Sequence, residues 1–165
     1  MKEQYWPLMW QSNLAVIKLR GAYADWARAN GMNYHELLVF YSLHELGSCT
    51  QKQICDSYRL PKQTVNNIVL ALQKAGYLEL VPGGPGRSKQ MRLTPAGKAY
   101  ERQHMGALYA LEQKAVVDMG PQNLQKMNEL LLQFGSILER EMFGVNGPDG
   151  ADGKENEEPE RENQD

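Results

Sequence analysis

Apolar residues recur every three or four positions over four parts of the chain, which is the spacing of one buried face on an α-helix. The first predicted helix runs from Tyr5 to Ala29, and a second begins at Asn33 and ends at Gly47. After Pro95, two longer helices follow, divided by Gly120-Pro121. The apolar residues of the last helix approach a heptad repeat, which favours packing against another helix.

Two shorter helices are predicted between Thr50 and Gly76. Thr50 and Gln53 have the spacing of a capping box, so a short helix is expected over residues 50–58. Arg59-Leu60 then make the turn, and Pro61 suits the first position of the next helix. The buried face of that helix is predicted to hold Val65, Ile68, Val69 and Leu72. This arrangement is a helix-turn-helix, whose second helix can enter a DNA major groove.

A β-hairpin follows directly. Tyr77–Val81 and Lys89–Leu93 are predicted strands, and the segment between them, PGGPGRS, is too rich in Gly and Pro for regular structure. A hairpin after a helix-turn-helix is a wing. The predicted fold class is therefore mainly α with a small β-hairpin wing.

The side chains on the outward face of the second short helix suit DNA. Asn and Gln amides can read adenine, Lys can meet guanine or phosphate, and the outward Leu70 suits a thymine methyl group. Arg87 in the wing suits a minor groove. An isolated amphipathic helix would more often carry these residues as a solvated face, but the hairpin favours DNA. The predicted DNA contacts are Thr50, Lys62, Gln63, Thr64, Asn66, Asn67, Arg87 and Lys89.

Residues 32–97 resemble the MarR family of bacterial winged-helix regulators. The matching features are Thr50, Ile54-Cys55 where the family favours Leu-Ala, Lys62-Gln63-Thr64-Val65, Leu72-x-x-x-Gly76-Tyr77-Leu78, and Arg87 six residues before Leu93-Thr94-Pro95-x-Gly97. One position departs from the family, because Pro85 stands where an Asp often helps to hold the wing Arg.

The resemblance implies a homodimer on a pseudo-palindromic double-stranded DNA site, acting as a repressor that responds to a small-molecule effector. It implies a helical dimerisation region over residues 1–30 and 95–143 and a DNA-binding domain over residues 31–94. An effector pocket at their junction would use Tyr23, Trp26, His35 and Tyr41.

Charge is unevenly distributed along the 165 residues, whose net charge is −2. Residues 50–98 hold eight Lys or Arg against two acids, whereas residues 144–165 hold eight acids against two basic residues. A local basic patch matters for phosphate contact more than the total charge does. The acidic segment has too few apolar residues for a core, so a disordered tail is expected.

Cysteine and histidine offer two further hypotheses. Cys49 precedes a helix, where a lowered pKa would suit a redox sensor, while Cys55 suits a small buried hydrophobe. His44 with Glu45 or Cys49 is a candidate zinc site, but no paired ligand spacing supports it, so neither a metal nor a cofactor is expected.

Other functional classes are less favoured. No nucleophile–base pair or phosphate-binding loop indicates an enzyme. No run is long enough to span a membrane and no signal peptide begins the chain, so a cytoplasmic location is expected. The alternative function is a winged-helix module that binds protein and does not read DNA.

Overall fold

The computed structural model describes residues 3–83 and 88–144, and contacts divide the chain into two compact units, Met1–Tyr109 and Ala110–Asp165. The described residues are mainly helical, as the sequence predicted, and hold one three-stranded antiparallel sheet.

The first unit begins with a short 3₁₀ turn, Glu3–Tyr5, and the long helix α1, Trp6–Ala29. Pro7 lies in the first turn of α1, where its missing N–H costs no helical hydrogen bond. Within α1 only Ala27 is fully buried, near the end that leads into the core.

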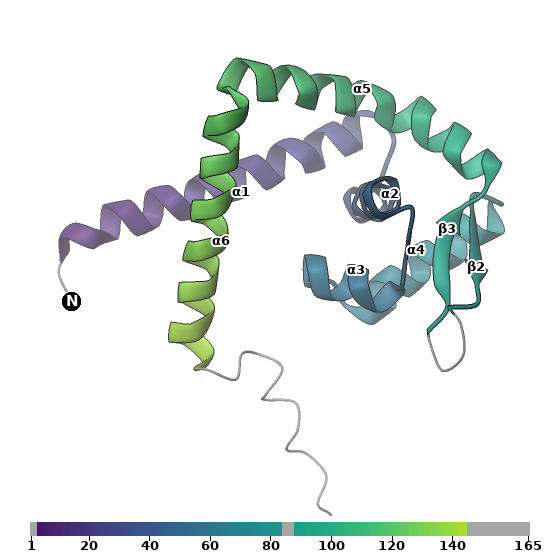
Figure 1. Ribbon diagram of the computed structural model, residues 1–165, viewed down its shortest axis with the longest axis horizontal. Coiled ribbons are helices and arrows are strands. Elements are labelled where there is room, and N and C mark those ends of the chain that lie inside the picture. Colours follow the sequence, from purple (N-terminus) through teal and green to yellow (C-terminus); the bar gives the residue numbers. More distant parts are fainter. Residues whose placement is uncertain (1–2, 84–87, 145–165) are drawn as a thin grey trace, which may run out of the picture. The chain divides into compact units, whose positions relative to one another are not determined.

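Helix α2, Tyr34–Leu46, forms the centre of the core and buries Leu37, Val39, Phe40 and Leu43. The side chain of Asn33 accepts a hydrogen bond from the backbone N–H of His35 at 2.8 Å and caps the helix. Helices α3 and α4 and the hairpin surround α2 (Figure 1).

Helix α3 spans Gln51–Tyr58 and begins with the predicted capping box. The hydroxyl of Thr50 accepts from the N–H of Gln53 at 3.1 Å, and the side chain of Gln53 accepts from the N–H of Thr50 at 2.7 Å. Arg59 ends α3 in the left-handed conformation, with φ 52°. The two polar termini of this short helix are therefore satisfied locally.

Helix α4 spans Lys62–Lys74 and buries Val65, Val69 and Leu72, as predicted. Its start differs from the prediction by one residue. Pro61 has ψ 139°, so it is the capping residue and not the first helical one. At the other end, the N–H of Tyr77 donates to the carbonyl of Leu72, while Gly76 takes φ 78°. This is a Schellman stop, and the left-handed Gly turns the chain into the wing.

The sheet contains one strand that the sequence did not predict. Strands β2, Leu78–Val81, and β3, Gln90–Leu93, form the expected hairpin. Strand β1, Ser48–Cys49, pairs with the other side of β3, and Cys49 lies opposite Met91. The sheet order is therefore β1-β3-β2, with β3 in the middle.

Helix α5, Pro95–Met119, is joined tightly to the base of the wing. The hydroxyl of Thr94 donates to the carbonyl of Gly76 at 2.7 Å and accepts from the N–H of Gly97 at 3.0 Å. A methyl group on Gly97 would overlap the backbone carbonyl of Tyr77. The Thr-Pro-x-Gly sequence thus lets the helix pass directly over the backbone between α4 and β2.

The buried side of α5 differs from the predicted one. The sequence placed Tyr100, His104, Leu108, Leu111 and Ala115 on one side. Gly97, Glu101, Met105 and Leu108 are the buried residues, whereas Leu111 is exposed. The prediction missed this face because it contains a glycine and a charged residue, which carry no apolar signal.

The second unit contains the end of α5 and helix α6, Pro121–Phe143. Gly120, with φ 85°, separates the two helices at the predicted break. No residue of α6 is buried. None of the helices within residues 3–83 and 88–144 combines the length and apolarity needed to cross a bilayer.

Candidate nucleic-acid interface

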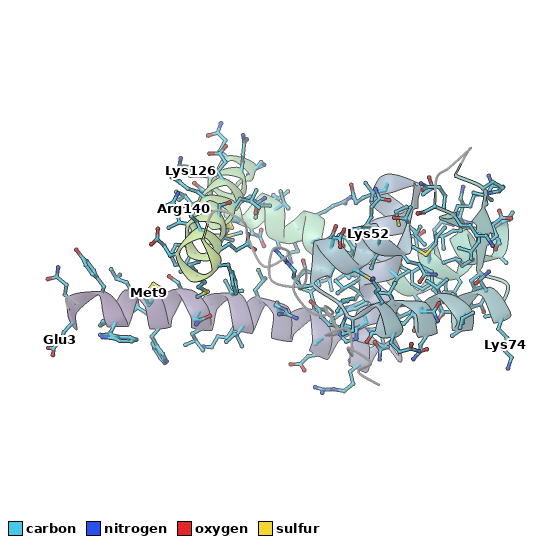
Figure 2. All side chains as sticks on the ribbon, turned by 90° about the horizontal axis from the view of Figure 1, so that it is seen from below. Glu3, Met9, Lys52, Lys74, Lys126 and Arg140 are labelled. Atoms are coloured by element: carbon cyan, nitrogen blue, oxygen red, sulfur yellow. The ribbon has the colours of Figure 1, made fainter. Side chains whose placement is uncertain are left out.

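One face of α4 points away from the core of the first unit. An α-helix turns about 100° per residue, so Gln63, Asn67, Leu70 and Lys74 lie directly opposite the buried Val65 and Leu72. These four side chains are exposed, and together they are called the reading face. Lys74 extends outward at the end of the helix (Figure 2).

The other predicted residues of α4 lie around this face. Thr64 and Asn66 are half-buried at its two flanks, and Lys62 is exposed at the helix start. Within the face, the side-chain amide of Gln63 donates to the side-chain oxygen of Asn67 at 2.8 Å. This contact fixes one amide against the other. The second N–H of Gln63 and the amide NH₂ of Asn67 remain available as hydrogen-bond donors.

The sheet brings Thr50 to the end of the hairpin from which the wing loop extends. Since Cys49 pairs with Met91 in an antiparallel ladder, Thr50 lies at the end of the sheet where β3 begins, close to Lys89 just before that strand. They line a surface hollow of about 240 Å³, here called the clamp hollow. Its lining residues are Thr50, Gln51, Lys52, Leu80, Ser88 and Lys89.

The clamp hollow has the chemistry of a phosphate contact. The N-terminus of α3 opens into it and carries the positive end of the helix dipole. Lys52 forms an ion pair with Asp56 at 2.7 Å, but both side chains are largely exposed, so the pair is weak and easily exchanged. Sequence reasoning named Thr50 and Lys89 but missed Lys52, Gln51 and Ser88, because their meeting depends on the unpredicted strand β1.

Two sequence predictions fall outside the described residues. Arg87 and Pro85 belong to residues 84–87, and the acidic segment belongs to residues 145–165 apart from Gly144. Elsewhere in the wing, Arg92 and Glu79 face one another across the hairpin, with their side-chain atoms 2.7 Å apart.

The predicted effector residues are distributed over two helices. Tyr23 and Trp26 of α1 and Tyr41 of α2 are half-buried and pack against the core. His35, also half-buried, lies against the ring of Tyr34 with centroids 5.8 Å apart. A larger hollow of about 360 Å³ is lined by other residues: Asn33, Glu36, Asn67, Ile68, Ala71, Leu72, Ala75 and Tyr77.

Titratable groups near that hollow are influenced by burial. Desolvation raises the pKa of Glu36, while the backbone N–H of Asn33 and the charge of His104 act in the opposite direction. Desolvation also raises the pKa of Tyr100, whose ring stacks on Tyr77 at 4.3 Å.

The thiol and histidine hypotheses change with the structure. Cys49 is fully buried, and desolvation raises its pKa to about 11, so the hypothesis of a lowered pKa is wrong. Cys55, expected to be buried, is only partly so. His44 engages Glu101 through Nδ1 at 2.7 Å. The described residues contain no group of three or more metal-ligating side chains.

Comparison with known proteins agrees with this geometry. Residues 30–88 match the model of the MarR family. A MarR family regulator from Neisseria meningitidis, NMB1585, is similar in structure with a TM-score of 0.72 and 26% identity, over 85% of this chain and 96% of that one. No curated protein matches the chain.

Two further solved structures share the fold. A MarR/EmrR family transcriptional regulator from Acinetobacter sp. ADP1 has a TM-score of 0.64 and 18% identity, covering 81% of this chain and 95% of its own. NadR in complex with 4-hydroxyphenylacetate also has a TM-score of 0.64, with 16% identity, covering 74% and 90%. Residues 30–88 are therefore similar to the MarR family of winged-helix transcriptional regulators, and over most of both chains the fold is similar to that of the MarR family regulator NMB1585.

Proposed function

We propose that this protein is a dimeric, sequence-specific DNA-binding repressor. The observation that carries the proposal is the reading face of α4, where two amides and a lysine are exposed on one helix side. In a symmetric dimer, two copies of α4 enter successive major grooves of a pseudo-palindromic duplex, about one helical turn apart.

The clamp hollow supplies contacts that do not depend on sequence. Lys52, in the first turn of α3, and Lys89 both line the hollow, and each can neutralise one phosphate. Lys62 adds charge at the start of α4, and Arg87 is proposed to add a further phosphate or minor-groove contact. Phosphate contacts fix the register of the protein on the duplex, and the reading face then selects bases.

The dimer is assigned to residues 1–30 and 95–143. Trp6, Trp10 and Ile17 on α1 and Leu130 on α6 are each more than half exposed. Apolar surface of this extent needs a partner to cover it, and a second copy is the partner that a two-fold DNA site requires.

Regulation by a small molecule is the finer part of the proposal. Its support is the structure of NadR, which holds 4-hydroxyphenylacetate in a protein of the same fold. The aromatic residues Tyr23, Trp26, His35 and Tyr41 are the proposed effector contacts, and the acidic segment 144–165 is proposed as a tail. The proposed regulator acts in the cytoplasm, requires no cofactor and has no enzymatic activity.

The test is binding to a duplex selected by the full-length protein from a pool of random sequences. Specific binding should exceed binding to a scrambled duplex by about a thousandfold or more. Asn67→Ala should weaken only the specific complex. Lys89→Gln should weaken both complexes and reduce the slope of log affinity against log salt by about two, because each dimer loses two phosphate contacts.

Lys126→Gln is the matched control, because Lys126 is an exposed lysine of α6, away from the winged helix in sequence. It should leave affinity and salt slope unchanged. If the pool yields no preferred sequence and Lys89→Gln has no effect, the proposal fails and a protein-binding winged helix replaces it.

A further inference from the structure

Leu70 is an apolar side chain on an otherwise polar face. It is 55% exposed, while Val65, Val69 and Leu72 of the same helix are buried. Between residues 31 and 94, leaving aside 84–87, the other exposed large hydrophobic side chain is Leu46, at the end of α2. Packing within the unit therefore does not account for a leucine at this position.

The place of Leu70 within the reading face is central. It follows Gln63 by two helical turns, Asn67 by three residues, and it precedes Lys74 by four residues. All four side chains thus point in one direction, and whatever contacts the amides of Gln63 and Asn67 also covers Leu70.

The chemistry of the major groove restricts what can meet this side chain. Base edges there present hydrogen-bond donors and acceptors, and the C5-methyl group of thymine is their apolar feature. A leucine pressed against a polar edge would exclude water without replacing its hydrogen bonds, which is unfavourable. A leucine against the thymine methyl buries apolar surface on both sides.

We infer that Leu70 selects thymine in the operator by contact with its C5-methyl group. The inference rests on the proposed function and identifies one base that the protein recognises. In a symmetric dimer, each half-site contains one such thymine, at equivalent positions about the two-fold axis. The neighbouring amides read the adjacent base pairs.

The experiment replaces the thymines of the pool-selected duplex by uracil, one position at a time. Uracil differs from thymine only in lacking the methyl group. At one position per half-site, the wild-type protein should lose about fourfold in affinity, the value of one buried methyl group. Leu70→Ala should bind thymine and uracil duplexes equally at that position. Cytosine and 5-methylcytosine at the same position provide a second methyl comparison, expected to follow the same order.

Leu46→Ala is the matched control, since Leu46 is 60% exposed and lies outside α4. It should retain the full thymine preference, and the melting temperatures of both variants should equal that of wild type. If Leu70→Ala keeps the preference, or if the wild-type protein shows none while binding specifically, the inference is overturned. If no sequence is enriched at all, the proposed function fails together with it.

Discussion

The winged helix buries its large apolar side chains, whereas the terminal helices α1 and α6 leave many of theirs exposed. Between α2 and β3, large side chains such as Phe40 and Ile54 are fully buried. On α1, Trp10 is 65% exposed, and α6 buries no residue. The winged helix therefore completes its own core, whereas α1 and α6 leave large apolar side chains exposed.

This difference separates two kinds of information in the sequence. Within the winged helix, caps, turns and apolar spacing all favour the same fold, so local and tertiary preferences agree. In α1 and α6, the spacing fixes a helix but leaves its partner open. We expect internal strain to destabilise the fold of the winged helix. We expect a charge on the surface of α6 to weaken the proposed dimer.

The largest effect is expected from strain where α5 crosses the winged helix. Gly97→Ala places a methyl group into the backbone carbonyl of Tyr77, which cannot move without breaking the hydrogen bond from the N–H of Thr94. The free energy of unfolding should fall by about 3 kcal/mol or more, measured by urea denaturation.

Gly106→Ala is the control on the same helix, because a methyl group there meets nothing within 4 Å. It should leave stability unchanged or raise it by about 1 kcal/mol, since Ala is the better helix former. Equal losses for both variants would contradict the role given to the Gly97 contact.

The next effect concerns the open surface of α6. Leu131 lies on the apolar stripe of the helix, and Leu131→Glu would place a charge within the proposed dimer contact. The dissociation constant of the dimer should rise by about thirtyfold or more, as for a central contact residue. Sedimentation equilibrium measures it directly.

Leu132→Glu tests whether this loss is specific to one side of α6. Leu132 is 74% exposed, but it is turned about 100° from Leu131 and lies off the stripe. Its dissociation constant should stay near that of wild type. A wild-type protein that is monomeric would contradict the proposed dimer surface. So would an equal rise in the dissociation constant for Leu131→Glu and Leu132→Glu.

A smaller effect is expected at the buried carboxylate of α5. Glu101 Oε1 accepts from Tyr109 at 2.8 Å and engages His44 at 2.7 Å, which ties α2 to α5. Glu101→Ala leaves both partners without their acceptor and should lower the free energy of unfolding by about 2 kcal/mol. Glu101→Gln keeps an acceptor oxygen and should cost less than half as much; equal costs would show that volume matters more than hydrogen bonding.

The sequence predicted the local features of the fold closely. The capping box at Thr50, the break at Gly120 and the Gly76 stop each depend on a few neighbouring residues, so their positions were found within a residue or so. The outward position of the reading face followed from helical spacing for the same reason.

What the sequence did not reveal depends on contacts between distant residues. Strand β1 has only two residues, too few for an alternating pattern, and its pairing with β3 joins Ser48 to Arg92. Without that pairing, Lys52 and Lys89 could not be placed around one hollow. The same strand turns Cys49 into the core, which reversed the expected roles of the two cysteines.

The smallest effect tests how tightly the winged helix is closed around Cys49. Its pKa is raised from 9.0 to about 11, because the buried thiolate loses its hydration. This thiol therefore adds stability that is fully present below pH 9 and is lost as pH rises through about 11, since the unfolded chain releases its proton first. The unfolding free energy of wild type should decline more steeply over this window than that of Cys49→Ala.

Within one molecule, iodoacetamide at pH 8 should label the partly exposed Cys55 well before Cys49, as peptide mass spectrometry can follow. Equal labelling would mean that the core around Cys49 opens as readily as the partly exposed surface of α3, and the closed core of the winged helix would be contradicted.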